Sequence, residues 1–489
     1  MRFVLRWLGG RMHASWFFMW ISIGVLAGSF AATISSGFDS YLWLIVALSL
    51  SLSSLLHKYR YLFVFALVAG MLLGLYRGSS EYVHLQDYQK YYGKEVVLTG
   101  RVVEDVSFGK KGDVRLRIGD VSIKGQHLPG VVWVSTSDTG VMKRGDLVTV
   151  RGSLLEGFGT MPASMFRAKI LGITYPSHGD IGREARDWFA GGVEKAVPGE
   201  DAQFALAYLV GQKLTTPETL NDQLKTIGLI HAVVASGAHL TILVGAVRRL
   251  FIKVSKYLTA VMSFGMIGGF LLVTGFSPSM TRAGLVSGIS LLAWYYGRVV
   301  HPMVLLPFVA AITVLYNPSY IWGDVGWYLS FAAFAGVIIL APLLHHYFWG
   351  ADKSPGIFRE VLIATIAAQV TTLPIVVAAF GYYSPYALLA NILVVPLVPL
   401  TMLLTFAAGI IGVVMPSLAF LIGLPLDAIL EYMKLVIDWL ATAPGAKKEL
   451  EIGWQVVAAA YTAIMFLMIY LWKVTGHSFR KNSNLQRDF

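Results

Sequence analysis

Long apolar runs at both ends of the chain enclose a middle region of short alternating segments. Three runs come first, at about 16–35, 41–56 and 61–76, and each approaches the roughly 20 residues that a helix needs to cross a bilayer. Further runs follow at roughly 228–247, 257–275, 282–297, 303–316, 325–343, 361–380, 386–413, 416–440 and 453–473. The pattern predicts a polytopic α-helical membrane protein with about 10–12 transmembrane helices.

The middle region, 78–177, alternates β-branched and polar residues. Five segments carry this pattern, and Gly and Asp separate them: EVVLTGRVVEDV (95–106), DVRLRIGDVSIK (113–124), GVVWVST (130–136), GDLVTVRGSLL (145–155) and FRAKILGI (166–173). About five short strands favour an inserted small β-barrel of the OB type, and a three-layer mixed domain is the alternative.

Residues 178–227 contain DIGREARDWFAGGVEKAVPGE, which is too charged to span a membrane and predicts interfacial amphipathic helices. The sequence therefore predicts five parts. These are N-terminal transmembrane helices (1–77), the β-domain (78–177), interfacial helices (178–227), a second transmembrane domain (228–473) and a basic tail (474–489).

The basic residues predict the orientation in the membrane. Lys and Arg cluster near the N-terminus, at 57–60, at 248–256, at 353–359 and in the tail. The positive-inside rule then places both termini in the cytoplasm and the β-domain outside the cytoplasmic membrane. The chain has 39 Lys+Arg against 28 Asp+Glu, a net charge of +11. The same rule explains this excess, attraction for a polyanion is the alternative, and charge alone does not separate the two.

Two regions permit more than one interpretation. The β-domain from Lys90 to Tyr175 has 13 Lys+Arg and 8 Asp+Glu, which suits single-stranded nucleic acid, although a domain with this balance can also bind none. In 386–440, Pro396 and Pro399 are positioned to break a helix. Farther on, four residues spaced 4-3-4 predict one polar stripe, either on an outer surface helix or facing a channel: Asp427, Glu431, Lys434 and Asp438.

Residues 228–243, GLIHAVVASGAHLTIL, place His231, Ser236 and His239 in an apolar run. Polar side chains are costly in hydrocarbon, so they mark either a path or contacts between helices. On one helix Ser236 and His239 would share a face, and the two histidines would lie about 12 Å apart, too far to share a metal ion. A membrane-embedded serine hydrolase at Ser236 is a further alternative. The chain has no cysteine, and we expect no metal site and no cofactor.

Four segments together resemble the competence domain of the ComEC family, the inner-membrane DNA channel of natural transformation. They are GLIHAVVASGAHL (228–240), TGFSPSMTRAGLVSGISLLAWYYGR (274–298), NPSYIWGDVGWYLSFAAFAGV (317–337) and QVTTLPIVVAAFGYYSPYALLANILVVPLV (369–398). Many relatives continue into a metallo-β-lactamase-like domain, whose H-x-H-x-D-H cluster does not occur in this sequence. The expected protein is thus a channel and not an enzyme, and a nuclease would be a separate protein.

The resemblance implies that single-stranded DNA crosses the bilayer through the second transmembrane domain. Six residues are the expected DNA path: His231, Ser236, His239, Arg282, Gln369 and Asn391. Secondary candidates are Ser279, Thr281, Arg298, Ser330 and Thr372. Arg282 would either extend to the membrane interface or meet phosphates at the channel mouth. No G-x-x-x-x-G-K-[ST] loop is present. An extracytoplasmic DNA receptor and a cytoplasmic ATPase or helicase-like motor are therefore the implied partners, and a transporter for another solute is the principal alternative function.

Overall fold

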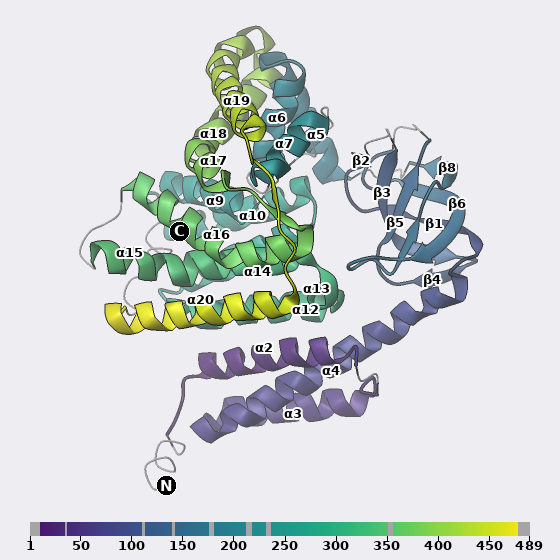
Figure 1. Ribbon diagram of the computed structural model, residues 1–489, viewed down its shortest axis with the longest axis vertical. Coiled ribbons are helices and arrows are strands. Elements are labelled where there is room, and N and C mark those ends of the chain that lie inside the picture. The colour runs from purple at the N-terminus through teal and green to yellow at the C-terminus, as the bar shows by residue number, and fades with distance from the viewer. Residues whose placement is uncertain are drawn as a thin grey trace. The chain divides into compact units, whose positions relative to one another are not determined.

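The computed structural model describes residues 10–34, 37–109, 113–138, 142–175, 180–211, 218–230, 236–350 and 356–477 (Figure 1). The chain forms two compact units. The first comprises Met1–Ser177 and Val300–Tyr328, and the second comprises His178–Val299 and Leu329–Phe489.

Seven helices of the described part are long and apolar enough to cross a membrane. They lie within Ala14–Ala31, Arg60–Tyr91, Lys256–Thr274, Val325–Trp349, Arg359–Phe380, Ala387–Val414 and Trp454–Thr475. Tyr41–His57 and Pro302–Tyr316 are shorter apolar helices. The prediction of a polytopic helical membrane protein with an inserted β-barrel is thus confirmed, whereas the orientation in the membrane stays a prediction.

The first unit combines membrane helices with the barrel. Its helices are α2 (Ala14–Ala31), α3 (Tyr41–His57), α4 (Phe63–Gln86), α12 (Pro302–Tyr316) and α13 (Ser319–Gly323), with short 3-10 turns η1 (Arg60–Leu62) and η2 (Asp87–Tyr91). Its strands are β1 (Glu95–Val102), β2 (Ser107–Phe108), β3 (Val114–Ile123), β4 (Gln126–Leu128), β5 (Val132–Thr136), β6 (Leu147–Glu156), β7 (Ala163–Met165) and β8 (Lys169–Thr174).

Helices α2 and α4 pack backbone against backbone through glycines. A Cβ atom added to Gly70 would lie 2.0 Å from the carbonyl oxygen of Ile21, and one added to Gly28 would lie 2.0 Å from that of Met71. Small residues four apart permit this close approach between membrane helices, which associate mainly by van der Waals contact. The spacing of Gly70 and Gly74 on α4 is therefore a packing signal that hydropathy alone does not reveal.

The β-domain is a closed five-stranded barrel with the strand order β1-β3-β5-β7-β6, and pairing of β1 with β6 closes it. Strands β5 and β7 are parallel, and the other pairs of the ring are antiparallel. Alternate residues of each strand fill the interior, as the burial of Val114, Leu116 and Ile118 on β3 shows. Tyr88, in the turn η2 after α4, is fully buried in the same core and joins the helix firmly to the barrel.

The barrel confirms the predicted OB-like domain but differs in its last strand. The strand expected over 166–173 begins only at Lys169, and the alternating pattern did not predict β7 before it. Both pieces pair with β6. The chain turns out of the extended conformation between them, where Arg167 has a φ of +52°. A three-residue strand is too short to show an alternating pattern, which is why β7 was missed.

Polar residues of the Asn-Pro segment hold the region from α12 to α14 (Val325–Ala335). Asn317 Oδ1 accepts hydrogen bonds from the backbone N–H and the hydroxyl of Ser319, and Asp324 Oδ1 accepts the N–H of Trp327. Trp327 Nε1 donates to Thr313 Oγ1 at 3.0 Å. These side chains satisfy backbone groups at helix ends, so the segment has a structural role here.

The second unit is helical. Its helices are α5 (Ile181–Ala196), α6 (Glu200–Val210), α7 (Glu218–Thr226), α9 (Gly237–Phe251), α10 (Lys256–Thr274), α11 (Pro278–Tyr295), the end of α14, the π turn η3 (Gly336–Leu340), α15 (Ala341–Trp349), α16 (Ile357–Phe380), α17 (Ala387–Val394), η4 (Val395–Leu397), α18 (Val398–Val414), η5 (Pro416–Leu418), α19 (Ala419–Thr442) and α20 (Trp454–Thr475). Two short strands, β9 (Tyr382–Tyr383) and β10 (Lys448–Glu449), pair with each other.

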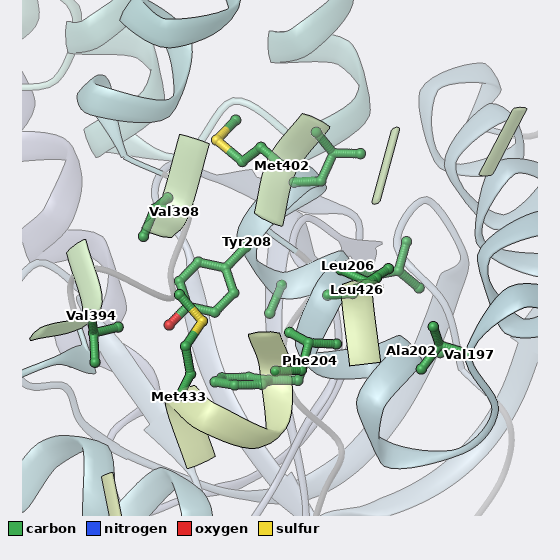
Figure 2. Packing of buried hydrophobic residues seen from close by; sticks show 14 of the residues in the cluster. Val197, Ala202, Phe204, Leu206, Tyr208, Val394, Val398, Met402, Leu426 and Met433 are labelled. Atoms are coloured by element: carbon green, nitrogen blue, oxygen red, sulfur yellow. The ribbon is translucent and has the colours of Figure 1, made fainter. Parts of the chain in front are cut away.

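Helix α6 lies in the middle of the largest apolar cluster of this unit. Figure 2 shows Phe204 and Tyr208 of α6 among Met402 of α18 and Leu426 and Met433 of α19. All five side chains are almost completely buried. Because neighbouring helices bury Ala202 and every residue from Phe204 to Val210, α6 can be apolar on all sides although it has only 11 residues.

Helix α5 contacts α18 through its backbone. A Cβ atom on Gly192 would lie 2.3 Å from the carbonyl oxygen of Gly409, and one on Gly412 would lie 1.9 Å from that of Gly192. Lys195 Nζ donates to the carbonyl oxygen of Gly412 at 3.3 Å. The amphipathic helix predicted at 180–200 is present, and glycines on both helices fix it against α18.

The ambiguous region 386–440 forms three helices. The predicted break occurs at η4, which contains Pro396, because proline lacks an N–H and cannot continue the helical ladder. On α19 two residues of the polar stripe contact other helices: Lys434 pairs with Asp201 of α6 at 2.6 Å, and Gln223 of α7 donates to Asp438 at 2.7 Å. Glu431 and Asp438 are themselves exposed. The exposed surface of α19 also carries large apolar side chains, among them Leu421, Leu424, Leu435 and Trp439.

Candidate functional site

Ser236 and His239 contact each other at the start of α9. The backbone N–H of Ser236 donates to His239 Nδ1 at 3.1 Å, and the Ser236 hydroxyl lies 2.8 Å from the same nitrogen. His239 is buried with 2% exposed area. Its neighbour in the predicted path, His231, lies outside the described residues. The sequence predicted that Ser236 and His239 share a face of one helix; the two side chains do meet, but Ser236 precedes the helix.

The expected unbroken helix over 228–247 is wrong at Ser236. This residue is extended, with φ −136° and ψ 172°, and it caps α9, which begins at Gly237. Serine is favoured at this position because its oxygen accepts a backbone N–H of the first turn, and the side chain of His239 accepts the N–H of Ser236 in return. This reciprocal cap accounts for the close serine–histidine pair without a catalytic role.

Replacing Ser236 with alanine is expected to lower the stability of the purified protein by about 1 kcal/mol, because α9 loses its N-terminal cap. Ser236→Asn, which can still cap, should retain most of that stability. Thermal unfolding of the two variants in one detergent measures the difference. A fluorophosphonate probe tests the hydrolase alternative: labelling that disappears in Ser236→Asn would show a nucleophile rather than a cap.

Arg282 lies inside the helical unit, on the second turn of α11. Only 3% of the residue is exposed, and its guanidinium carbon lies 5.3 Å from the ring centroid of Phe331 on α14. The sequence suggested that this side chain extends to the interface or faces outward; the structure buries it instead. A Cβ atom on Gly237 would lie 3.4 Å from that of Ala283, so the start of α9 lies beside the turn that carries Arg282.

The structure thus brings Ser236, His239 and Arg282 to one region, where α9 and α11 begin. Ser279 and Thr281 belong to the same first turn of α11 and are half-buried. Arg298 lies at the opposite end of α11 and is exposed. The predicted path residues on these two helices are therefore divided between the two ends of α11.

The polar residues of α16 and α17 mostly bond within their own helices. Thr371 Oγ1 donates to the Ala367 carbonyl at 3.0 Å, Thr372 Oγ1 donates to that of Ala368, and Asn391 Nδ2 donates to that of Ala387 at 2.7 Å. Such bonds satisfy the side chain locally and suit packing. Gln369 on α16 and Ser330 on α14 are half-buried and make no side-chain hydrogen bond within the described part of the chain. They remain candidates for lining a path.

A second candidate site lies on the outer surface of the barrel. Arg117 of β3 lies directly opposite Trp133 of β5. The ring centroid of Trp133 lies 5.6 Å from that of Phe158 and 4.9 Å from that of Phe166. Directly opposed residues project from the same face of an antiparallel pair. We call this surface the barrel patch, and it consists of Arg115, Arg117, Trp133, Phe158, Phe166 and Arg167.

The barrel patch combines exposed aromatic rings with cations. Phe158 and Phe166 are each 49% exposed. Arg117 pairs with Glu104 at 2.6 Å on the surface, an arrangement that contributes little and is readily exchanged for another anion. Arg167 is exposed, and no carboxylate of the described residues pairs with it. Stacking rings beside cations are what a single strand of nucleic acid requires, because every base offers a π-face and every phosphate a charge.

The loop that carries Phe158 is held by Tyr92. The hydroxyl of Tyr92 donates to the Pro162 carbonyl at 2.6 Å. Burial, followed by the nearby charge of Glu156, raises the pKa of Tyr92, so this donor keeps its proton at neutral pH. The basic balance of the β-domain was predictable from the sequence, but the position of its cations beside aromatic rings was not predicted. The alternation in VRLRI and VWV is the signal that could have placed Arg117 and Trp133 on one face.

Within the described residues, no group of three or more His, Asp or Glu side chains is arranged to hold a metal ion.

Comparison with known proteins places the helical candidates in a recognised region. The family whose description is "Competence protein" matches residues 208–474, more than half of the chain. ComE operon protein 3 of Bacillus subtilis (strain 168) is 23% identical over 246 residues, which are 50% of this chain and 30% of that protein. The match thus spans about a third of the length of the curated relative. No solved structure matches the chain.

Proposed function

The chain belongs to the competence protein family, and from this premise we propose that it takes part in DNA uptake as the channel that passes single-stranded DNA inward across the cytoplasmic membrane. The observation that carries the proposal is the family match over 208–474, which contains Ser236, His239 and Arg282. We propose a channel rather than an enzyme. A separate nuclease, an outer DNA receptor and a cytoplasmic ATPase or helicase-like motor are part of the proposal.

A polyanion needs a polar path through the bilayer, because phosphates cannot be left unpaired in hydrocarbon. The region where α9 and α11 begin supports this, since it gathers Ser236, His239 and the buried cation Arg282. Gln369 and Ser330 would add polar lining. Because Arg282 lies against Phe331, a strand that passes through this region would have to displace this contact.

The barrel patch supports the single-stranded form of the substrate. In a duplex the bases are stacked and unavailable, whereas in a single strand they can stack on Trp133, Phe158 and Phe166. The arginines beside these rings would bind the phosphates. In the proposed orientation the barrel lies outside and receives the strand before it enters the helical unit.

Replacing Trp133 with alanine is expected to weaken binding of a dT20 oligonucleotide by about 5- to 150-fold, because stacking contributes roughly 1–3 kcal/mol per base. Fluorescence anisotropy with the purified full chain measures the affinity at fixed salt. Tyr175→Ala is the matched control, since Tyr175 is an exposed aromatic residue of the same domain but follows β8, which pairs with β6 and not with β3 or β5.

The same assay separates the proposal from the solute-transporter alternative. A channel for single strands should bind dT20 more tightly than a duplex of equal length, and the affinity should fall steeply with added salt. A solute transporter should bind neither nucleic acid. Equal affinity of wild type and Trp133→Ala for dT20 would remove the barrel patch from the proposal.

A further inference from the structure

One end of the α9–α10–α11 group concentrates positive charge. Residues 228–323 contain six Lys or Arg and no Asp or Glu. Five of the six lie at the end of α9, in the following loop, at the start of α10 or after α11; they are Arg248, Arg249, Lys253, Lys256 and Arg298. The sixth, Arg282, lies at the opposite end of α11. The five cations thus form one cluster at one end of the three helices.

Trp294 of α11 organises the centre of this cluster. The guanidinium carbon of Arg248 lies 4.5 Å from its ring centroid, and Lys256 Nζ lies 5.6 Å from the same centroid. Lys256 also lies 5.5 Å from the ring of Tyr295. These cation–π contacts hold both cationic groups beside the ring of Trp294. We name the five cations and Trp294 the Trp294 cluster.

An exposed apolar face begins directly beside the cluster. Tyr257 follows Lys256, and Val261, Phe264 and Leu272 continue at helical spacing along α10; all four are exposed. Between them Gly268 is open, since an added Cβ would meet nothing within 4 Å. At 1.5 Å per residue this face is about 22 Å long, which is comparable to an extended acyl chain. The cations thus lie at the head of a lipid-accessible apolar strip.

We propose that the Trp294 cluster binds the phosphate headgroup of an anionic phospholipid, whose acyl chains lie along the exposed face of α10. Basic pockets between membrane helices at one membrane surface bind such headgroups, and each cation near an anionic surface adds attraction. A nucleic acid would also require a polar groove for its sugar-phosphate backbone. The surface that continues from the cluster along α10 is instead an apolar strip, which favours a lipid. The proposal does not depend on DNA transport.

The test compares lipids of equal shape and different charge. The purified full chain is equilibrated with equimolar dioleoyl phosphatidylglycerol and dioleoyl phosphatidylcholine, and native mass spectrometry counts the retained molecules. The wild type should retain phosphatidylglycerol in preference. The double variant Arg249→Gln/Lys256→Gln should bind it roughly thirty-fold more weakly, since two cations of the cluster are removed. Lys473→Gln, at the exposed end of α20, is the matched control and should not change the preference.

Several results would overturn the proposal. Equal retention of the two lipids by the wild type would do so, and so would an unchanged preference in the double variant. If the double variant lost affinity for dT20 but kept phosphatidylglycerol, the cluster would serve nucleic acid instead. Arg249→Lys/Lys256→Arg keeps the charge and should keep the lipid preference. Loss in both double variants would therefore indicate damaged folding and a structural role.

Discussion

Replacing Arg282 with alanine is expected to abolish entry of DNA into the cytoplasm while the protein still inserts in the membrane. Arg282 is the cation of the region where α9 and α11 begin, and it is the charge there that a phosphate could meet. Removing it would leave each passing phosphate without a partner in a low-dielectric surrounding, at a cost of several kcal/mol. The expected loss of uptake is about a hundredfold or more.

The measurement is entry of labelled DNA into cells that lack the chain and are complemented with each variant. DNA should stall outside the cytoplasm in the deletion and in Arg282→Ala, and it should enter with the wild type. Arg282→Lys keeps the charge but loses the planar fork that binds phosphate oxygens bidentately, so uptake should be intermediate. Arg359→Ala is the matched control, because Arg359 also lies over an aromatic ring, Trp349, but is exposed at the start of α16.

Immunoblots of the membrane fraction must show equal amounts of each variant. Should Arg282→Ala fail to accumulate, Arg282→Met fills the apolar volume beside Phe331 and removes only the charge. Normal uptake by a variant without charge at position 282 would refute the proposed path, and unchanged uptake in the deletion would refute the channel itself.

Gly192→Ala is expected to destabilise the helical unit strongly, whereas Gly191→Ala is expected to stabilise it slightly. The new Cβ atom at position 192 would lie 2.3 Å from the Gly409 carbonyl oxygen, so α5 and α18 would have to separate. Overpacking of this kind typically costs 1–3 kcal/mol, and here we expect about 3 because the obstacle is backbone. The Cβ atom at position 191 would meet nothing within 4 Å, and alanine is favoured over glycine inside a helix by roughly 0.5–1 kcal/mol.

Thermal unfolding of the two purified variants checks this pair, and opposite signs are the decisive result. The two substitutions are chemically identical and adjacent, so any general effect on helix formation is common to both. If both variants unfolded at the wild-type temperature, the backbone contact between α5 and α18 would be absent from the folded protein.

The sequence predicted most of the architecture because hydropathy records burial in lipid directly. The runs at 303–316 and 361–380 became α12 and α16 almost without change. The break at Pro396 was predictable because proline removes a backbone donor. The close contacts of Gly28 with Met71 and of Gly192 with Gly409 were not predictable. A glycine in a sequence indicates that another helix can approach closely, but it does not identify that helix.

The candidate site was predictable in its members and less so in its geometry. Ser236 and His239 were expected to be near each other, and they are, but as a helix cap rather than as two residues of one helix. Arg282 was identified as an important charge, yet its burial depends on contact with Phe331 of α14. That helix begins 43 residues after Arg282 in the sequence. Contacts of this kind depend on tertiary packing and leave no local periodicity in the sequence.

The junction between α4 and the barrel has a mechanical consequence. Tyr88 is embedded in the barrel core two residues after α4 ends, and Leu85 of α4 lies near the loop residue Gly130. The barrel is thus joined directly to the helix and not through a flexible linker. The length of α4 determines the direction in which Trp133 points around the helix axis, because each added residue would rotate the barrel by about 100°. If α4 tilts in the bilayer, the barrel tilts with it, so the thickness of the membrane would affect the orientation of the barrel patch.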